Sequence, residues 1–170
     1  MKNPLSVNTV ELLRRPGTER ELRLSVPPGS IGLDDLRIVP DAEVDIDLRC
    51  ESLSDGIVVD GGVSVRFRGD CRRCLAPVEG RLDSPLHELY QVNLTDPDAF
   101  PIEGDQIDLS VAIRETVLLD LPDAPVCRPD CAGLCPVCGI DLNSGSCSCE
   151  APSTDPRWAA LDALRDQLPE

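Results

Sequence analysis

The sequence predicts an α+β fold, with an antiparallel sheet or small open β-barrel of about five or six strands flanked by two or more helices. Several segments alternate apolar and polar residues with the period of a half-buried strand, and others space their apolar residues for one helix face. Nine cysteines, eight of them in close pairs, predict a zinc-binding C-terminal segment. A chain of 170 residues, 41% hydrophobic, can bury one such core with a small appendage.

The N-terminal third predicts a short helix and two strands. A helix is expected to start at Asn8, a favourable cap, and to stop at Pro16-Gly17. Residues 22–26 alternate as a strand, which the break at Pro27-Pro28-Gly29 ends. Residues 42–50 alternate most regularly. Their apolar face and largely acidic face predict a half-buried antiparallel strand.

The middle of the chain predicts further strands. Residues 57–59 lead into Asp60-Gly61-Gly62, which is typical of a turn, and residues 63–68 alternate again. We therefore expect a hairpin whose turn lies at the glycines. The alternation continues over residues 75–94. Two prolines in that stretch predict bends or an edge position, namely Pro77 and Pro85.

A loop and two helices are expected after these strands. Residues 95–106 are rich in proline and acidic residues and predict an exposed loop. A helix should run from Asp108 or Ser110 to about Leu119. Near the C-terminus Asp155 can cap a second helix, with Pro156 as its first residue and a stripe at Trp158, Leu161, Leu164 and Leu168.

The chain then divides into three parts. Residues 1–126 form the predicted sheet domain, residues 127–150 a cysteine-rich segment packed on it, and residues 151–170 a C-terminal helix. No run of about 18 apolar residues is present, so we expect no transmembrane helix. The N-terminus lacks the apolar block of a signal peptide, which favours a cytoplasmic protein.

The charge balance argues against a general affinity for nucleic acid. Sixteen basic residues oppose 31 acidic ones, and the net charge of −15 repels a polyanion. Aromatic residues make up only 2%, too few for a reader that stacks bases on several rings. Contact with RNA or a partner is expected instead at the most basic short stretch, unless these side chains merely coat a solvated hairpin. The stretch comprises Arg66, Arg68, Arg72 and Arg73.

Eight cysteines are candidate metal ligands. In a reducing compartment, close pairs of cysteines bind metal more often than they form disulfides. The pairs are Cys71 and Cys74, Cys127 and Cys131, Cys135 and Cys138, and Cys147 and Cys149. Gly139, which follows one pair, can take the left-handed conformation that lets the backbone curl beneath a metal. The remaining residue, Cys50, lies on the apolar face of its strand and is expected to be a buried thiol.

Two groupings of these ligands remain open. In the first, Cys71, Cys74, Cys127 and Cys131 hold one Zn²⁺, and Cys135, Cys138, Cys147 and Cys149 hold a second. In the second, Cys127, Cys131, Cys135 and Cys138 form a single local site and leave the other pairs free. The first leaves fewer exposed thiols, which favours it.

Constellations typical of enzymes are absent from the sequence. His87 is the only histidine, and no glycine-rich phosphate loop is present. A redox role for Cys71-Arg72-Arg73-Cys74 stays open, because two arginines would lower a thiol pKa. The pair follows a strand and a turn, however, and not the strand-to-helix junction of a thioredoxin-like protein.

Several stretches together resemble one known family. They are Gly69-Asp70-Cys71-Arg72-Arg73-Cys74-Leu75, Leu121-Pro122, the run from Cys127 to Gly139, Asp141-Leu142-Asn143, and Asp155-Pro156-Arg157. The chain is similar over nearly its whole length to the YceD-like family of bacterial proteins, which is linked to accumulation of large-subunit ribosomal RNA. The family's motif cysteines correspond to Cys71, Cys74, Cys127, Cys131, Cys135 and Cys138.

The resemblance implies a role in the synthesis, processing or stability of that RNA. We therefore expect a non-enzymatic factor, with one or two Zn²⁺ ions, that docks a ribosomal protein or the pre-ribosomal large subunit. Direct RNA contact would be limited to the arginine stretch, and neither a membrane nor a small-molecule substrate is expected. The alternatives are a thiol redox protein that uses Cys71 and Cys74, or a zinc-ribbon adaptor unrelated to ribosomes.

Overall fold

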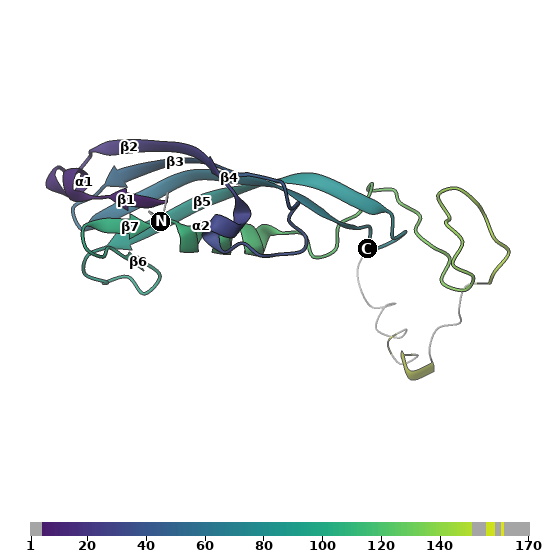
Figure 1. Cartoon of the computed structure of the whole chain (residues 1–170). Coiled ribbons are helices and arrows are strands. Elements are labelled where there is room, and N and C mark those ends of the chain that lie inside the picture. Colours follow the sequence, from purple (N-terminus) through teal and green to yellow (C-terminus); the bar gives the residue numbers. More distant parts are fainter. Residues whose placement is uncertain (1–4, 151–155, 159–160, 162–170) are drawn as a thin grey trace.

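A five-stranded, mostly antiparallel sheet forms the body of the protein. The computed structural model describes residues 5–150, 156–158 and 161. The strands follow one another in sequence order across the sheet: β2 (Glu19–Val26), β3 (Val44–Ser52), β4 (Gly56–Asp70), β5 (Pro77–Gln91) and β6 (Phe100–Pro101). Only the short β5–β6 pair is parallel. The sheet stays open (Figure 1), so the α+β prediction is confirmed in its sheet form.

The helices and a second small sheet complete the body. Strands β1 (Ser6–Asn8) and β7 (Gln106–Asp108) pair with each other. The helical elements are α1 (Val10–Arg14), η1 (Pro28–Ile31), α2 (Ser110–Asp120) and η2 (Pro156–Trp158). The helix predicted from Asp155 to Leu168 lies largely outside the described residues. Within the described part of the chain, no helix is long and apolar enough to cross a bilayer.

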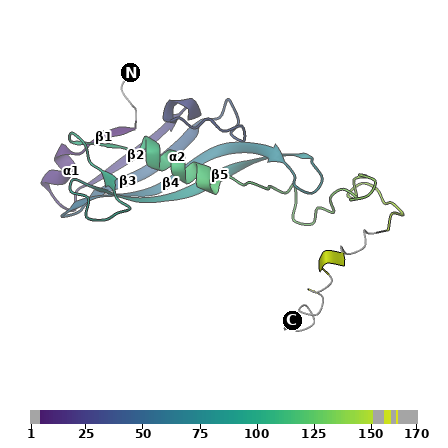
Figure 2. The ribbon, with the colours of Figure 1, turned by 90° about the horizontal axis from the view of Figure 1, so that it is seen from below.

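The core lies between one face of the sheet and α2. Alternate residues of each strand point to this face, as the sequence period requires, and the opposite face carries charged side chains. Helix α2 lies across the inner face (Figure 2) and buries Ala112, Ile113 and Val117 against it. The two larger of these side chains, Ile113 and Val117, each contribute about 1.5–3 kcal/mol. The Asp108 carboxylate accepts a hydrogen bond from the Ser110 amide at 2.9 Å, but the N-cap residue is Leu109, which makes no side-chain cap hydrogen bond, so the predicted cap at Asp108 or Ser110 is wrong.

The turn predicted at Asp60-Gly61-Gly62 is wrong. Strand β4 runs unbroken through these residues, and Gly61 pairs with Leu48 on one side and Leu86 on the other. Gly61 has φ +148°, and a Cβ there would lie 2.2 Å from the Asp47 carbonyl oxygen. The glycine therefore permits close approach of β3 within a strand, a role that a local sequence pattern cannot separate from a turn.

Strands β4 and β5 form a hairpin of 15 residues each, which extends beyond the part of the sheet covered by α2 (Figure 1). Over most of its length β5 is an edge strand, because β6 pairs only with Tyr90 and Gln91. The predicted edge position of the prolines is thus confirmed. Near the hairpin end, the amide of Arg68 donates to the Arg37 carbonyl at 2.7 Å, so a loop segment supports β4 there. The hairpin presents its turn, residues 71–76, to the cysteine segment.

Candidate metal centre

Eight cysteines gather into two groups of four at the end of the hairpin. The inner cluster consists of Cys71, Cys74, Cys127 and Cys131, and the outer cluster of Cys135, Cys138, Cys147 and Cys149. Within each cluster the sulfur atoms all lie within 4.8 Å of one another, so each group could hold a metal ion. The structure thus has the first of the two groupings drawn from the sequence, and not the single local site. Cys50 is buried on the core face as predicted, and burial raises the pKa of its thiol.

The sulfur distances fit metal ligation and do not fit disulfides. The Sγ atoms of Cys71 and Cys131 are 3.9 Å apart, and those of Cys74 and Cys127 are 3.7 Å apart. A disulfide requires about 2.05 Å. Four thiolates at about 2.3 Å from a tetrahedral zinc ion are separated by about 3.8 Å. All nine cysteines are free thiols.

Two tight backbone turns present the hairpin pair and one segment pair in the same way. The Leu75 amide donates to the Cys71 carbonyl at 2.8 Å, and the Gly139 amide donates to the Cys135 carbonyl at 2.9 Å. The residue that closes each turn is left-handed, with φ +60° at Leu75 and +74° at Gly139. The left-handed conformation predicted for Gly139 is confirmed. At Leu75 it costs about 1–2 kcal/mol, because a side chain is present.

Backbone amides prepare one thiol of each cluster to act as a thiolate. Amides of Cys127 and Cys74 lower the pKa of Cys71 to about 6. Amides of Cys138 and Val137 lower the pKa of Cys135 to about 6, and the Val137 nitrogen lies 3.4 Å from its sulfur. These hydrogen bonds favour the thiolate, the form in which cysteine binds metal.

Arg73 ties the hairpin end to the cysteine segment. Its guanidinium donates to the carbonyls of Pro129 at 3.0 Å and Cys131 at 2.9 Å. Its own carbonyl accepts a hydrogen bond from the Leu134 amide at 2.9 Å. A Cβ at Gly133 would lie 2.9 Å from the same carbonyl, so the two backbones meet closely. Sequence reasoning placed this arginine in the basic stretch and beside the thiols of Cys71 and Cys74, and it gave no signal of these contacts.

The other predicted arginines lie in different settings. Arg66 and Arg68 share the outer face of β4, and Arg68 donates to the Leu36 carbonyl at 3.3 Å. Arg66 and Arg72 are exposed, and among the described residues their side chains make no hydrogen bond or ion pair. A role in partner or RNA binding stays a prediction for this set.

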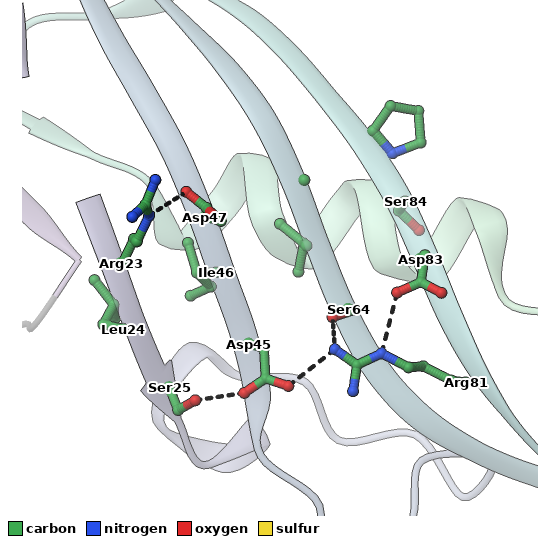
Figure 3. A pocket seen from close by; sticks show the side chains of 13 residues that line it. Arg23, Leu24, Ser25, Asp45, Ile46, Asp47, Ser64, Arg81, Asp83 and Ser84 are labelled. Carbon is green, nitrogen blue, oxygen red and sulfur yellow. Dashed lines mark hydrogen bonds and ion pairs between the residues drawn. The ribbon is translucent and has the colours of Figure 1, made fainter. Parts of the chain in front are cut away.

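A hollow of about 730 Å³ lies on the uncovered face of the sheet, over Gly62, which has no side chain to fill it (Figure 3). Its charged residues are paired: Arg23 with Asp47 at 3.1 Å, and Arg81 with Asp45 and Asp83, each at 3.1 Å. The only histidine, His87, lies on the same face beside Asp60, away from both clusters. The sequence gave no signal of this hollow, because it depends on register across four strands.

Comparison with known proteins identifies the family. The sequence profile described as large ribosomal RNA subunit accumulation protein YceD matches residues 59–165. The chain belongs to the YceD family. An uncharacterized protein of Mycobacterium tuberculosis is 42% identical over 167 residues, which cover 94% of this chain and 80% of that protein. An uncharacterized protein of Mycobacterium leprae is 35% identical over 179 residues, 99% of this chain and 81% of that protein.

A plant member matches a smaller part of the chain. The chloroplastic YCED homolog 1 of Arabidopsis thaliana, named a large ribosomal RNA subunit accumulation protein, is 36% identical over 69 residues. The match covers 41% of this chain and 22% of that protein. No solved structure is significantly similar. Membership in the YceD family associates the chain with accumulation of the large ribosomal RNA subunit, and the family is named for that process and not for a reaction.

Proposed function

We propose that the protein is a non-enzymatic cytoplasmic factor that supports synthesis, processing or stability of large-subunit ribosomal RNA. It does so by docking a ribosomal protein or the pre-ribosomal large subunit through a zinc-stabilised surface at the hairpin end. The observation that carries this proposal is the composition of the inner cluster. Two of its thiols come from the hairpin turn and two from the cysteine segment, so one ion there joins the two parts.

Zinc fits this donor set. Each cluster offers four thiols and no carboxylate, the set typical of closed structural zinc sites. A catalytic zinc site keeps a fourth position open for water, whereas four thiolates fill the tetrahedron. When bound, zinc would supply folding free energy to the segment and no reaction step.

The rigid turn of the hairpin presents side chains that the fold does not use. Leu75 is 64% exposed. Its backbone is left-handed, a conformation that is unfavourable for leucine. Arg72, in the same turn, is exposed as well. An exposed apolar side chain held on a strained, metal-supported turn favours contact with a partner. We assign Leu75 and Arg72 to the docking surface, together with the predicted Arg66 and Arg68.

Charge favours a protein as the direct partner. The chain carries −15, and thiolate-bound zinc in two clusters makes it more negative still. A basic ribosomal protein complements such a body, and RNA contact is confined to the few exposed arginines. The proposal keeps the predicted division into residues 1–126, 127–150 and 151–170, with the middle part as the metal-dependent element.

The first test is elemental analysis of natively purified protein, with two zinc ions per chain as the expected result. Folded, metal-free protein with reactive Cys71 and Cys74 would instead support the redox alternative.

The second test is co-sedimentation of zinc-loaded protein with purified large-subunit particles. Arg72→Glu should weaken association by about tenfold or more. Arg15→Glu makes the same charge change next to α1, away from the hairpin end, and should leave association intact. Equal binding by both variants, or no binding by the wild type, would overturn the docking proposal. A weak dependence on salt would indicate protein docking, and a steep one contact with phosphates.

A further inference from the structure

Asn143 belongs to the loop of the outer cluster but contacts the inner one. It lies between Cys138 and Cys147 in the sequence. Its side-chain nitrogen lies 3.5 Å from the sulfur of Cys131 and donates a hydrogen bond toward it. The same nitrogen donates to the Asp141 carboxylate at 2.6 Å. The amide group is therefore aimed at a ligand of the other cluster.

The acceptor side of the same amide fixes the backbone around that ligand. The Asn143 oxygen accepts hydrogen bonds from the Ala132 amide at 2.9 Å and from the Arg128 guanidinium at 2.6 Å. Both donors flank the inner-cluster ligand Cys131 in the sequence. Asn143 thus uses both ends of its side chain on the inner cluster.

The backbone of the loop between Cys138 and Cys147 is held by Gly133 and Cys135, which follow the inner-cluster ligand Cys131 in the sequence. The Leu142 amide donates to the Gly133 carbonyl at 2.9 Å, and the Cys135 amide donates to the Ile140 carbonyl at 2.9 Å. A metal at the outer cluster would fix both ends of this loop, at Cys138 and Cys147. The position of Asn143 therefore depends on the outer cluster, while its hydrogen bonds act on the inner one.

We infer that Asn143 couples the two clusters, so that each binds zinc more tightly when the other is loaded. The inference rests on the proposed zinc binding. A hydrogen bond to a thiolate ligand stabilises its charged form, and loss of such outer contacts typically costs about 10- to 100-fold in metal affinity. Coupling between two sites is reciprocal. Three of the four outer cysteines are exposed, whereas two of the inner ones are buried, so the outer cluster is the more accessible to metal exchange. Through the coupling, loading of the outer cluster strengthens zinc binding at the inner cluster, which joins the hairpin to the cysteine segment.

The test measures zinc affinity of each cluster alone and of both together. Reduced, metal-free protein is titrated with Zn²⁺ against a chromophoric chelator. Cys147→Ser/Cys149→Ser leaves only the inner cluster, and Cys74→Ser/Cys127→Ser only the outer one. For the wild type, the product of the two association constants should exceed the product of the single-cluster constants by about 10- to 100-fold.

Variants of the loop identify the residue responsible. Asn143→Ala should bring this ratio close to one. Asn143→Asp, which keeps the acceptor oxygen but lacks the N–H donor, should lower it as well. Ser144→Ala is the matched control, because the Ser144 hydroxyl donates to the Asp141 carbonyl at 3.3 Å and makes no hydrogen bond to an inner-cluster cysteine among the described residues, so the ratio should stay unchanged. An unchanged ratio in Asn143→Ala would overturn the inference.

A second measurement serves if a single-cluster variant fails to fold. Native mass spectra are recorded at half-saturation with Zn²⁺. The one-ion form should be scarce in the wild type and make up about half or more of the Asn143→Ala protein, as for independent sites. Two ions that bind independently to the wild type would refute the coupling and leave zinc loading intact. Failure to bind any zinc would refute the proposed function itself.

Discussion

Removal of metal should release the cysteine segment from the hairpin and leave the sheet folded. Among the described residues, three hydrogen bonds between nitrogen and oxygen atoms join the two parts: the Leu134 amide to Arg73, and Arg73 to Pro129 and Cys131. At about 0.5–1.5 kcal/mol each, they supply about 1.5–4.5 kcal/mol. Ordering the backbone of residues 127–150 costs about 1–2 kcal/mol per residue, several times more than these bonds return.

Burial of apolar side chains does not offset the remaining entropic cost of ordering the cysteine segment. Only three residues of the segment are buried, namely Cys131, Gly133 and Cys135. A structural zinc ion contributes about 10–16 kcal/mol, so two ions supply free energy of the required order. The sheet has its own core under α2 and draws on neither ion.

The assay is amide hydrogen exchange before and after treatment with a strong chelator, at neutral pH and under reducing conditions. Amides of Leu134, Cys135 and Leu142 should lose protection, while those of β3 and β4 next to α2 should keep it. Chelator already saturated with zinc serves as the control. Persistent protection in the segment, with metal loss verified by elemental analysis, would refute the reasoning.

Three further predictions concern the body and the turn. Leu75→Gly should leave the free energy of unfolding unchanged or raise it by up to about 1 kcal/mol, because glycine adopts the left-handed backbone conformation without the strain that leucine has there. The same change should weaken co-sedimentation with large-subunit particles. A clear loss of stability in urea would contradict the first expectation. Gly61→Ala should lower the free energy of unfolding by at least about 2 kcal/mol, because its Cβ would lie 2.2 Å from a carbonyl oxygen of β3. The control is Gly62→Ala, where the nearest atom to the new Cβ is 3.8 Å away and the loss should stay under about 1 kcal/mol. Equal urea midpoints for the two variants would contradict this. Asp35→Asn should lower the free energy of unfolding by up to about 1 kcal/mol at neutral pH, because Arg37 lowers the pKa of the Asp35 carboxyl. The difference in stability from wild type should vanish as the pH falls below the ordinary aspartate range. A difference that grows in acid would argue against a stabilising Asp35–Arg37 ion pair.

Local periodicity predicted the elements whose structure is set locally. The alternation in residues 42–50 became β3, and the apolar spacing after Asp108 became α2. Cysteine doublets predicted ligand pairs, because two close thiols on one turn can reach a single ion. How the pairs combine depends on where the hairpin ends, and the sequence left that open.

Features that depend on a distant neighbour escaped prediction. Gly61 resembles a turn residue until β3 is placed beside it. Arg73 resembles a surface cation until the carbonyls of Pro129 and Cys131 are brought to it from more than fifty positions away. Asn143 stood in a motif but had no assigned partner, since its target sulfur belongs to the other cluster.

The prolines of β5 also bear on solubility. A long ribbon with an open edge can recruit a strand from another molecule and begin a fibril. Pro77 and Pro85 lie eight positions apart in one strand, so their nitrogens face the same side, and proline is tolerated where that side is the open one. Each removes a hydrogen-bond donor that an incoming strand would need. The ribbon can therefore project from the body without acting as a template for aggregation.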